Sequence, residues 1–237
     1  MGLWRQVAQA AEELLWPTGC IACDQPGTLL CDQCQQQLAW VTQRWACPVC
    51  GAPYGWLACT ECDRSWESAG CVSAFSYKGP AAALVTGYKD GHERRLAPVL
   101  ASALACALDE ASLCPGHPLP SLADFDGVTF IPSTAEAYRR RGFDPIEEVS
   151  RSLATIVDVP WVDTLFHGPT QDQRTLGRED RAANVAFSFS TAASVEGATL
   201  LLVDDVITTG ASVREATRAL LCRGADKVWV ASVARTW

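Results

Sequence analysis

Residues 199–213 read TLLLVDDVITTGASV, and this stretch decides the fold class. Its apolar block, residues 200–203, shows no alternation, which is typical of a strand buried on both faces of a parallel sheet. Asp204 and Asp205 follow at the point where such a strand should leave its sheet. The small residues 208–212 then open a helical pattern. The stretch therefore predicts a strand, turn and helix of an α/β fold, with the turn at the ligand-binding edge of the sheet.

The small residues after the acidic pair are suited to binding an anion. Free N–H groups at a helix start, the helix dipole and hydroxyl side chains all favour negative charge. An acidic pair beside a phosphate would repel it unless the carboxylates bind hydroxyl groups or a cation. A sugar phosphate with free ribose hydroxyls and a bound Mg²⁺ meets both conditions. The candidate phosphate-binding residues are Thr208, Thr209, Gly210, Ala211 and Ser212.

Two alternatives exist for this stretch. One is an ordinary strand–turn–helix connection with a solvated acidic pair. The other is a Walker A loop, which is excluded because no Gly-Lys-Ser/Thr follows the strand.

Eight of the twelve cysteines form four CxxC pairs in the first third of the chain. Two such pairs supply the four thiolates of a tetrahedral Zn²⁺ site, so the spacing predicts two structural zinc ions. We expect consecutive pairs to share an ion, although interleaved pairing, redox chemistry or disulfides are alternatives. The predicted groups are Cys20, Cys23, Cys31 and Cys34, and Cys47, Cys50, Cys59 and Cys62. Gly51, directly after Cys50, is predicted to supply the tight turn of a zinc knuckle. Cys71, Cys106, Cys114 and Cys222 have no CxxC partner and are interpreted as small apolar residues.

The 237 residues carry 19 Lys and Arg against 27 Asp and Glu, a net charge of −8. This balance weighs against a broad nucleic-acid surface. Residues 1–16 read as an amphipathic helix stopped by Pro17, not as a signal peptide. No apolar run reaches the roughly 18 residues of a membrane span, and residues 96–108, with Pro98, are predicted to form a buried helix. We therefore expect a cytoplasmic protein.

Six of the nine tryptophans lie in the first 66 residues, together with three arginines and six acidic residues. Aromatic side chains in a zinc module can stack on bases. The acidic balance instead favours internal packing and a protein-docking surface over nucleic-acid binding.

The rest of the chain alternates predicted strands and helices. Apolar runs predict strands at 71–77, 127–131 and 227–233, and helices at 80–88 and 145–157. Two polar segments and one glycine between them are also informative. Residues 138–143 (YRRRGF) form a basic cluster that suits an anion such as pyrophosphate, with a solvated helix face as the alternative. Residues 168–187 are polar and are predicted to be a lid or a linker. Gly224 is predicted to end the helix that begins near residue 208.

The run VDDVITTG at 203–210 resembles the phosphoribosyl pyrophosphate (PRPP) motif of type I phosphoribosyltransferases. In that family the two acids hold the ribose hydroxyls, and the loop after them holds the 5′-phosphate. Purine-salvage members carry an acid as base catalyst where Thr208 stands here, so its absence argues against purine salvage.

Nearly the whole chain resembles the ComF family, which includes GntX-like proteins and is tied to DNA uptake by competent bacteria. Besides the CxxC pairs, the matches are Tyr77, Tyr88-Lys89, Pro132, Arg141-Gly142-Phe143 and the spacing of Thr170, Gln173, Leu176, Arg181, Asn184, Ala186 and Phe187. Asp144 and Pro145 depart from the family's usual Asn and Gln, and because a carboxylate near a pyrophosphate site is unfavourable, no binding role is expected of Asp144. The resemblance implies a zinc-ribbon domain over 1–66 and, over 67–237, a phosphoribosyltransferase-like domain with a doubly wound parallel sheet.

The resemblance also implies a function. Asp204 and Asp205 would hold the ribose of PRPP with Mg²⁺, and Lys89 and Arg181 would neutralise developing charge. Pro132, Ser133, Thr134 and Arg141 would line the pyrophosphate side. The expected reaction is phosphoribosyl transfer to an acceptor that the sequence does not identify. The alternative is a non-catalytic sensor of PRPP or a nucleotide, which docks on the DNA-uptake machinery, including helicase-type proteins, through its zinc ribbons.

Overall fold

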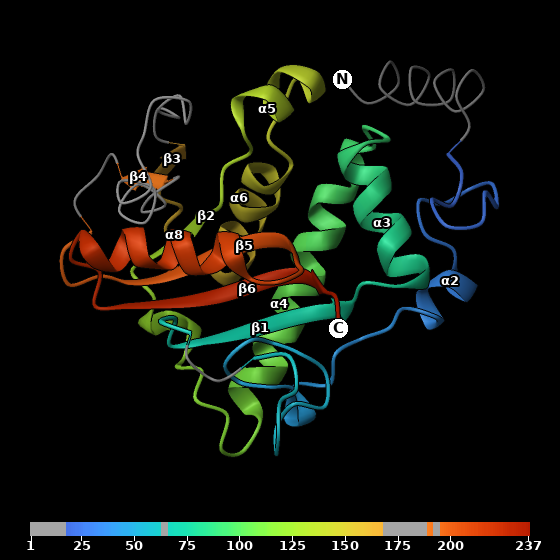
Figure 1. The fold of residues 1–237 in the computed structure, drawn as a ribbon. Coiled ribbons are helices and arrows are strands. Elements are labelled where there is room, and N and C mark those ends of the chain that lie inside the picture. The colour runs from blue at the N-terminus through green and yellow to red at the C-terminus, as the bar shows by residue number, and fades with distance from the viewer. Residues whose placement is uncertain (1–17, 63–65, 168–188, 192–194) are drawn as a thin grey trace, which may run out of the picture.

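The computed structural model describes residues 18–62, 66–167, 189–191 and 195–237 (Figure 1). The predicted N-terminal helix over 1–16 and the predicted lid over 168–187, including Arg181, lie outside these described residues.

Four parallel strands form the central sheet, in the order β1-β6-β5-β2. They are β1 (Gly70–Ser76), β6 (Lys227–Arg235), β5 (Thr199–Ile207) and β2 (Gly127–Phe130). The predicted strands are thus confirmed, with bounds shifted by one or a few residues. A small antiparallel pair, β3 (Leu165–His167) and β4 (Phe189–Thr191), was not predicted.

Strand β5 is longer than predicted. The sequence places its end at the acidic pair, yet the strand continues to Ile207 because its ladder with β6 runs on from Asp204↔Ser232 to Ile207↔Arg235. On the other side, pairing with β2 stops at Phe130↔Val203. The acidic pair therefore lies beyond the end of one neighbouring strand while it is still held by the other.

Helices cover both faces of the sheet, as a doubly wound fold requires. Helices α3 (Gly79–Lys89), α4 (Ala97–Leu113) and α6 (Pro145–Val157) share a core with one face, which includes Leu201 of β5. Helix α8 (Ala211–Cys222) shares a second core with the other face, which includes Leu200 and Leu202. In Figure 1, α8 lies in front of the sheet and α4 crosses behind it.

The remaining described helices are short. They are α2 (Asp32–Gln36), α5 (Ala135–Arg141), and the 3-10 turns η1 (Gln43–Trp45), η2 (Arg94–Leu96) and η3 (Leu122–Asp124). The predicted end of α8 is confirmed, since Gly224 has a φ of 95° and donates to the Leu221 carbonyl at 3.1 Å.

One helical stretch, Arg94–Leu113, is long and apolar enough to cross a membrane by length and composition, with a mean hydropathy of 1.5. The sequence predicts no apolar run of that length. The helical stretch is longer than predicted because it begins at Arg94 with η2 and continues past residue 108 to Leu113. Leu100, Leu104 and Leu108 are at most 2% exposed and lie in the core against the sheet. As predicted, α4 is a buried helix of the α/β core.

The cysteine-rich segment packs onto the same cores. Ile21, Leu29 and Leu38 contact the core under α3, α4 and α6. Cys47, Cys50, Ala52 and Trp66 belong to the core under α8.

Candidate functional site

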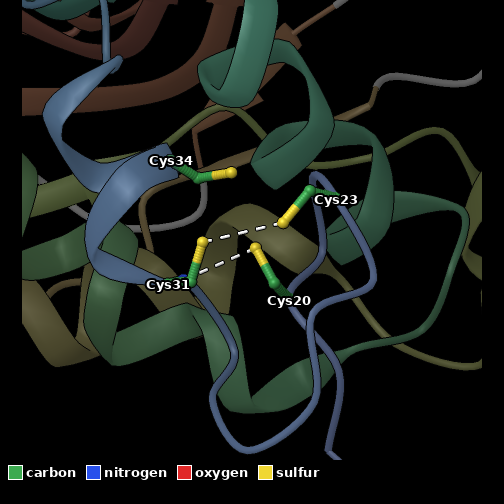
Figure 2. Close-up of side chains that lie close together, drawn as sticks. All are labelled: Cys20, Cys23, Cys31 and Cys34. Carbon is green, nitrogen blue, oxygen red and sulfur yellow. Dashed lines mark hydrogen bonds between the residues drawn. The ribbon is translucent and has the colours of Figure 1, made fainter.

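The eight CxxC cysteines form two groups of four, and each group brings its sulfur atoms within 4.8 Å of one another. The groups follow the predicted sequential pairing, so the interleaved alternative is wrong. Figure 2 shows the first group, in which Cys20 and Cys23 come from a loop and Cys31 and Cys34 from the start of α2.

The sulfur separations fit a tetrahedral zinc ion. Zn–S bonds of about 2.3 Å place the corners of a tetrahedron about 3.8 Å apart. Cys23 and Cys31 are separated by 3.6 Å, Cys50 and Cys59 by 3.6 Å, and Cys47 and Cys62 by 3.8 Å. Each group supplies four thiolates and leaves no open position, which is the pattern of a structural zinc site. Both groups could hold zinc.

The second cysteine group (Cys47, Cys50, Cys59 and Cys62) is closed by the predicted glycine turn. Gly51 has a φ of 69° and donates to the Cys47 carbonyl at 2.9 Å. A Cβ at Gly51 would lie 2.5 Å from Ser73 Oγ on β1, so the turn is pressed against the sheet. Only glycine fits a positive φ at such a close approach.

The loop between β5 and α8, residues 208–210, and the first residues of α8 form a narrow cavity of about 40 Å³ with Asp204. Helix α8 begins at Ala211 rather than at Thr208, because Gly210 adopts a left-handed conformation (φ 76°) as its N-cap. The hydroxyl of Thr209 accepts from the Ala211 N–H at 3.4 Å. The predicted phosphate-binding residues and one acid of the pair therefore line one cavity.

A wider cavity of about 310 Å³ adjoins the first and shares Val206 and Thr208 with it. We call it the Lys89 cleft. Lys89 Nζ lies 2.6 Å from Asp205 Oδ2, and Arg141 Nη2 lies 3.2 Å from Asp90 Oδ1. The cleft is lined by Tyr77, Val85, Thr86, Lys89, Asp90, Arg141, Asp205, Val206, Thr208 and Thr236. The structure thus brings four predicted site residues, Lys89, Arg141, Asp205 and Thr208, into one cleft.

The carboxylates of Asp204 and Asp205 repel each other when both are ionised. Burial, together with the charge of Asp205 beside it, raises the pKa of Asp204 from 3.8 to about 8. The Asp205 N–H donates to Asp204 Oδ1 at 2.9 Å and offsets only part of this effect. A bound cation or hydroxyl groups would relieve the repulsion, because both favour the ionised carboxylate.

Asp144, one of the two departures from the family pattern, is the N-cap of α6. Its Oδ1 accepts from the N–H groups of Ile146 at 3.1 Å and Glu147 at 3.4 Å, and its Oδ2 accepts from the Ser133 N–H at 2.6 Å. Pro145, the other departure, occupies the first turn, where its missing N–H costs nothing. Asp144 and Pro145 therefore start α6, and Asp144 also fixes the turn after β2.

Not every predicted site residue meets the cavities. Pro132, Ser133 and Thr134 line neither of the two, and the Thr134 hydroxyl caps α5 by accepting from the Ala137 N–H at 3.2 Å. A role for these three residues at the pyrophosphate stays a prediction.

Two residues next to the site are not indicated by the sequence pattern. Arg235 contacts the loop at Ile207 and Thr208, and Trp66 packs against Gly210. A charged residue directly after the apolar run of β6 was the one available signal for Arg235. Its partners are distant in sequence, so the pattern did not reveal them.

Comparison with known proteins assigns the α/β domain to a class. Residues 139–236 match the phosphoribosyl transferase domain family. The chain is 30% identical over 232 residues to the DNA utilization protein YhgH of Salmonella typhi, covering 93% of this chain and 98% of that one. It is 27% identical over 216 residues to competence protein F of Haemophilus influenzae, covering 87% of this chain and 90% of the other.

Solved structures resemble the chain more distantly. The allosteric regulatory enzyme of purine biosynthesis is 20% identical, with a TM-score of 0.42, over 59% of this chain and 25% of that one.

The α/β domain is thus a phosphoribosyltransferase-type domain that follows two cysteine groups. The chain belongs to the ComF family, together with the competence F and DNA utilization proteins.

Proposed function

We propose that this chain binds PRPP with Mg²⁺ and transfers its phosphoribosyl group to an acceptor with release of pyrophosphate. The single observation that carries this proposal is the junction of the two cavities at Val206 and Thr208. One cavity offers a helix start and hydroxyls, and the other offers two cations, Lys89 and Arg141, with the two carboxylates Asp90 and Asp205. A molecule with a phosphate at one end, a ribose in the middle and a pyrophosphate at the other matches this order.

In this arrangement the 5′-phosphate occupies the narrow cavity, where residues 208–212 supply N–H groups and hydroxyls. Asp204 and Asp205 accept hydrogen bonds from the ribose hydroxyls. Mg²⁺, which prefers carboxylates and substrate phosphates, supplies charge compensation when bound beside the pair. Zn²⁺ in the two cysteine groups holds the N-terminal segment folded.

Lys89 and Arg141 then face the pyrophosphate in the Lys89 cleft. Transfer at the ribose C1 passes through cation-like character, so the leaving group gains negative charge as its bond breaks. Two cations positioned beforehand stabilise that charge. We propose that further residues complete the pyrophosphate side of the site: Pro132–Thr134 and Arg181, the latter outside the described residues.

The names of the relatives support a link to DNA uptake, which we propose as the cellular setting, in the cytoplasm. The test is a calorimetric titration with PRPP, with and without Mg²⁺, followed by a pyrophosphate-release assay over candidate bases. Binding that requires Mg²⁺ together with release on one base supports the transferase. Binding without release on any acceptor favours the sensor instead, and no binding overturns both.

A further inference from the structure

Arg235 connects the second cysteine group to the loop between β5 and α8. Its side chain is 1% exposed. The Nε atom donates to the Cys50 carbonyl at 3.1 Å. The Nη1 atom donates to the carbonyls of Ile207 at 3.1 Å, Thr208, and Thr236 at 3.0 Å. One buried guanidinium therefore holds the backbone of a metal-binding turn and the backbone that opens the phosphate-binding loop.

This arrangement constrains the loop strongly. A buried charge is costly unless its hydrogen bonds are satisfied, so the carbonyls must stay where the guanidinium can reach them. The second cysteine group adds an electrostatic constraint, because four thiolates around one Zn²⁺ leave two negative charges near Arg235. Loss of the ion would remove that partner and free the turn that presents the Cys50 carbonyl.

Trp66 makes a second connection, which does not depend on Arg235. Its side chain is 8% exposed and follows the last cysteine of the group by four positions. A Cβ at Gly210 would lie 2.3 Å from Trp66 Cζ2, so the indole packs directly against the N-cap of α8. The guanidinium of Arg214, in the first turn of α8, lies 5.9 Å from the same ring.

The first cysteine group makes its contacts elsewhere. Ile21 packs on Gly87 of α3, where a Cβ would lie 2.4 Å from Ile21 Cδ1. Arg95 donates to the Thr18 hydroxyl at 3.0 Å. Among the described residues, the hydrogen bonds that link a cysteine group to residues 207–208 come from the second group alone, through Arg235.

We propose that Arg235 is a positioning residue that couples metal occupancy of the second cysteine group to ligand binding at the β5–α8 loop. The proposal rests on the proposed function, because its ligand is PRPP. Metal in the second group tightens PRPP binding, whereas metal in the first group does not act on the loop. Coupling between two binding sites is reciprocal, so PRPP must raise the zinc affinity of the second group by the same factor.

The test measures zinc affinity by equilibrium competition with a chromogenic chelator, with and without PRPP and Mg²⁺, on the full chain. In Cys20→Ser/Cys23→Ser, which retains the second group, PRPP should raise zinc affinity by about fivefold or more. In Cys59→Ser/Cys62→Ser, which retains the first group, PRPP should leave zinc affinity unchanged.

Arg235→Lys provides a test in a chain with all eight ligands, in case the cysteine variants do not fold. A lysine keeps the charge but cannot span the carbonyls. This variant should retain two zinc ions and lose most of the PRPP effect on zinc affinity, because only the contact of Trp66 with Gly210 remains. The matched control is Arg218→Lys, which changes an exposed arginine paired with Glu67 at 2.8 Å and should keep the effect.

PRPP binding to the unaltered chain with no change in zinc affinity would overturn the coupling and leave the proposed function standing. A full PRPP effect in Arg235→Lys would also overturn it. No PRPP binding to the unaltered chain would overturn the proposed function, and the coupling with it.

Discussion

Lys89 Nζ lies 2.6 Å from Asp205 Oδ2, so the end of α3 is joined to the acidic pair of β5. Both side chains are about one-quarter exposed, at 24% and 25%, and both face the Lys89 cleft. The ion pair places a cation and a carboxylate beside each other before any ligand arrives. A pre-positioned charge pair of this kind reduces the reorganisation that ligand binding requires.

Lys89→Ala should weaken binding of PRPP with Mg²⁺ by about tenfold, because a charged hydrogen bond to the pyrophosphate is lost. Calorimetry is the measurement. Lys227→Ala is the matched control, since Lys227 also lies near an aspartate, at 3.8 Å from Asp226 Oδ2, but outside the cleft. Equal affinity in the two variants would remove Lys89 from the binding site.

Zinc analysis should give two ions per chain, and replacement of Cys71, Cys106, Cys114 and Cys222 by alanine should leave that number unchanged. These four cysteines lie outside both groups of sulfur atoms. Their interpretation as small apolar residues in apolar surroundings is wrong for Cys106 and Cys222, which are exposed. Cys71 is fully buried, and desolvation raises the pKa of its thiol to about 12, which disfavours the thiolate that a metal needs. The measurement is the zinc content per chain, by elemental analysis of protein purified without chelator. Fewer than about one ion per chain would contradict two zinc sites.

Asp204→Asn should stabilise the fold at alkaline pH. The folded-state pKa of Asp204 is raised from 3.8 to about 8, so the folded chain holds an extra proton between these values. Stability from the protonated carboxyl is complete below about pH 4 and is lost as pH rises through about 8. Asparagine stays neutral, so the variant should melt about 2–4 °C above the unaltered chain at pH 8.5, and the gain should shrink toward pH 6.

The control for this comparison is Asp109→Asn, an exposed aspartate on α4. A gain of the same size at both pH values, or in the control, would show that Asp204 is not the group responsible.

Asp144→Ala should destabilise the chain by about 1–2 kcal/mol, because α6 loses its N-cap and the Ser133 N–H loses its acceptor. Chemical denaturation of the zinc-loaded protein measures the change. Asp109→Ala, which removes an exposed aspartate, should change stability by less than about 0.5 kcal/mol. Equal stabilities would mean that the cap contributes nothing.

The sequence predicted the features that depend on local pattern. Unbroken apolar runs identified the buried strands, as in Leu200–Val203, and CxxC spacing identified both cysteine groups. Gly224 and Gly51 were predicted correctly because a positive φ favours glycine wherever the chain must turn.

Features that depend on distant partners could not be predicted. The end of β5 is set by β6, whose ladder carries the strand through the acidic pair to Ile207. Arg235 donates a hydrogen bond to the Cys50 carbonyl, 185 positions away, and Trp66 packs against Gly210, 144 positions away. Asp144 looked unfavourable beside a pyrophosphate, yet three backbone N–H groups surround its carboxylate.

The most direct test of the account is PRPP affinity of the double variant Asp204→Asn/Asp205→Asn, measured by calorimetry with Mg²⁺. Loss of charged hydrogen bonds worth about 1.5–3 kcal/mol each predicts binding more than tenfold weaker than in the unaltered chain. Zinc content and thermal unfolding show whether the variant is folded. Unchanged affinity in a folded variant that carries two zinc ions would contradict a PRPP site at this loop, and the proposed transferase would fall with it.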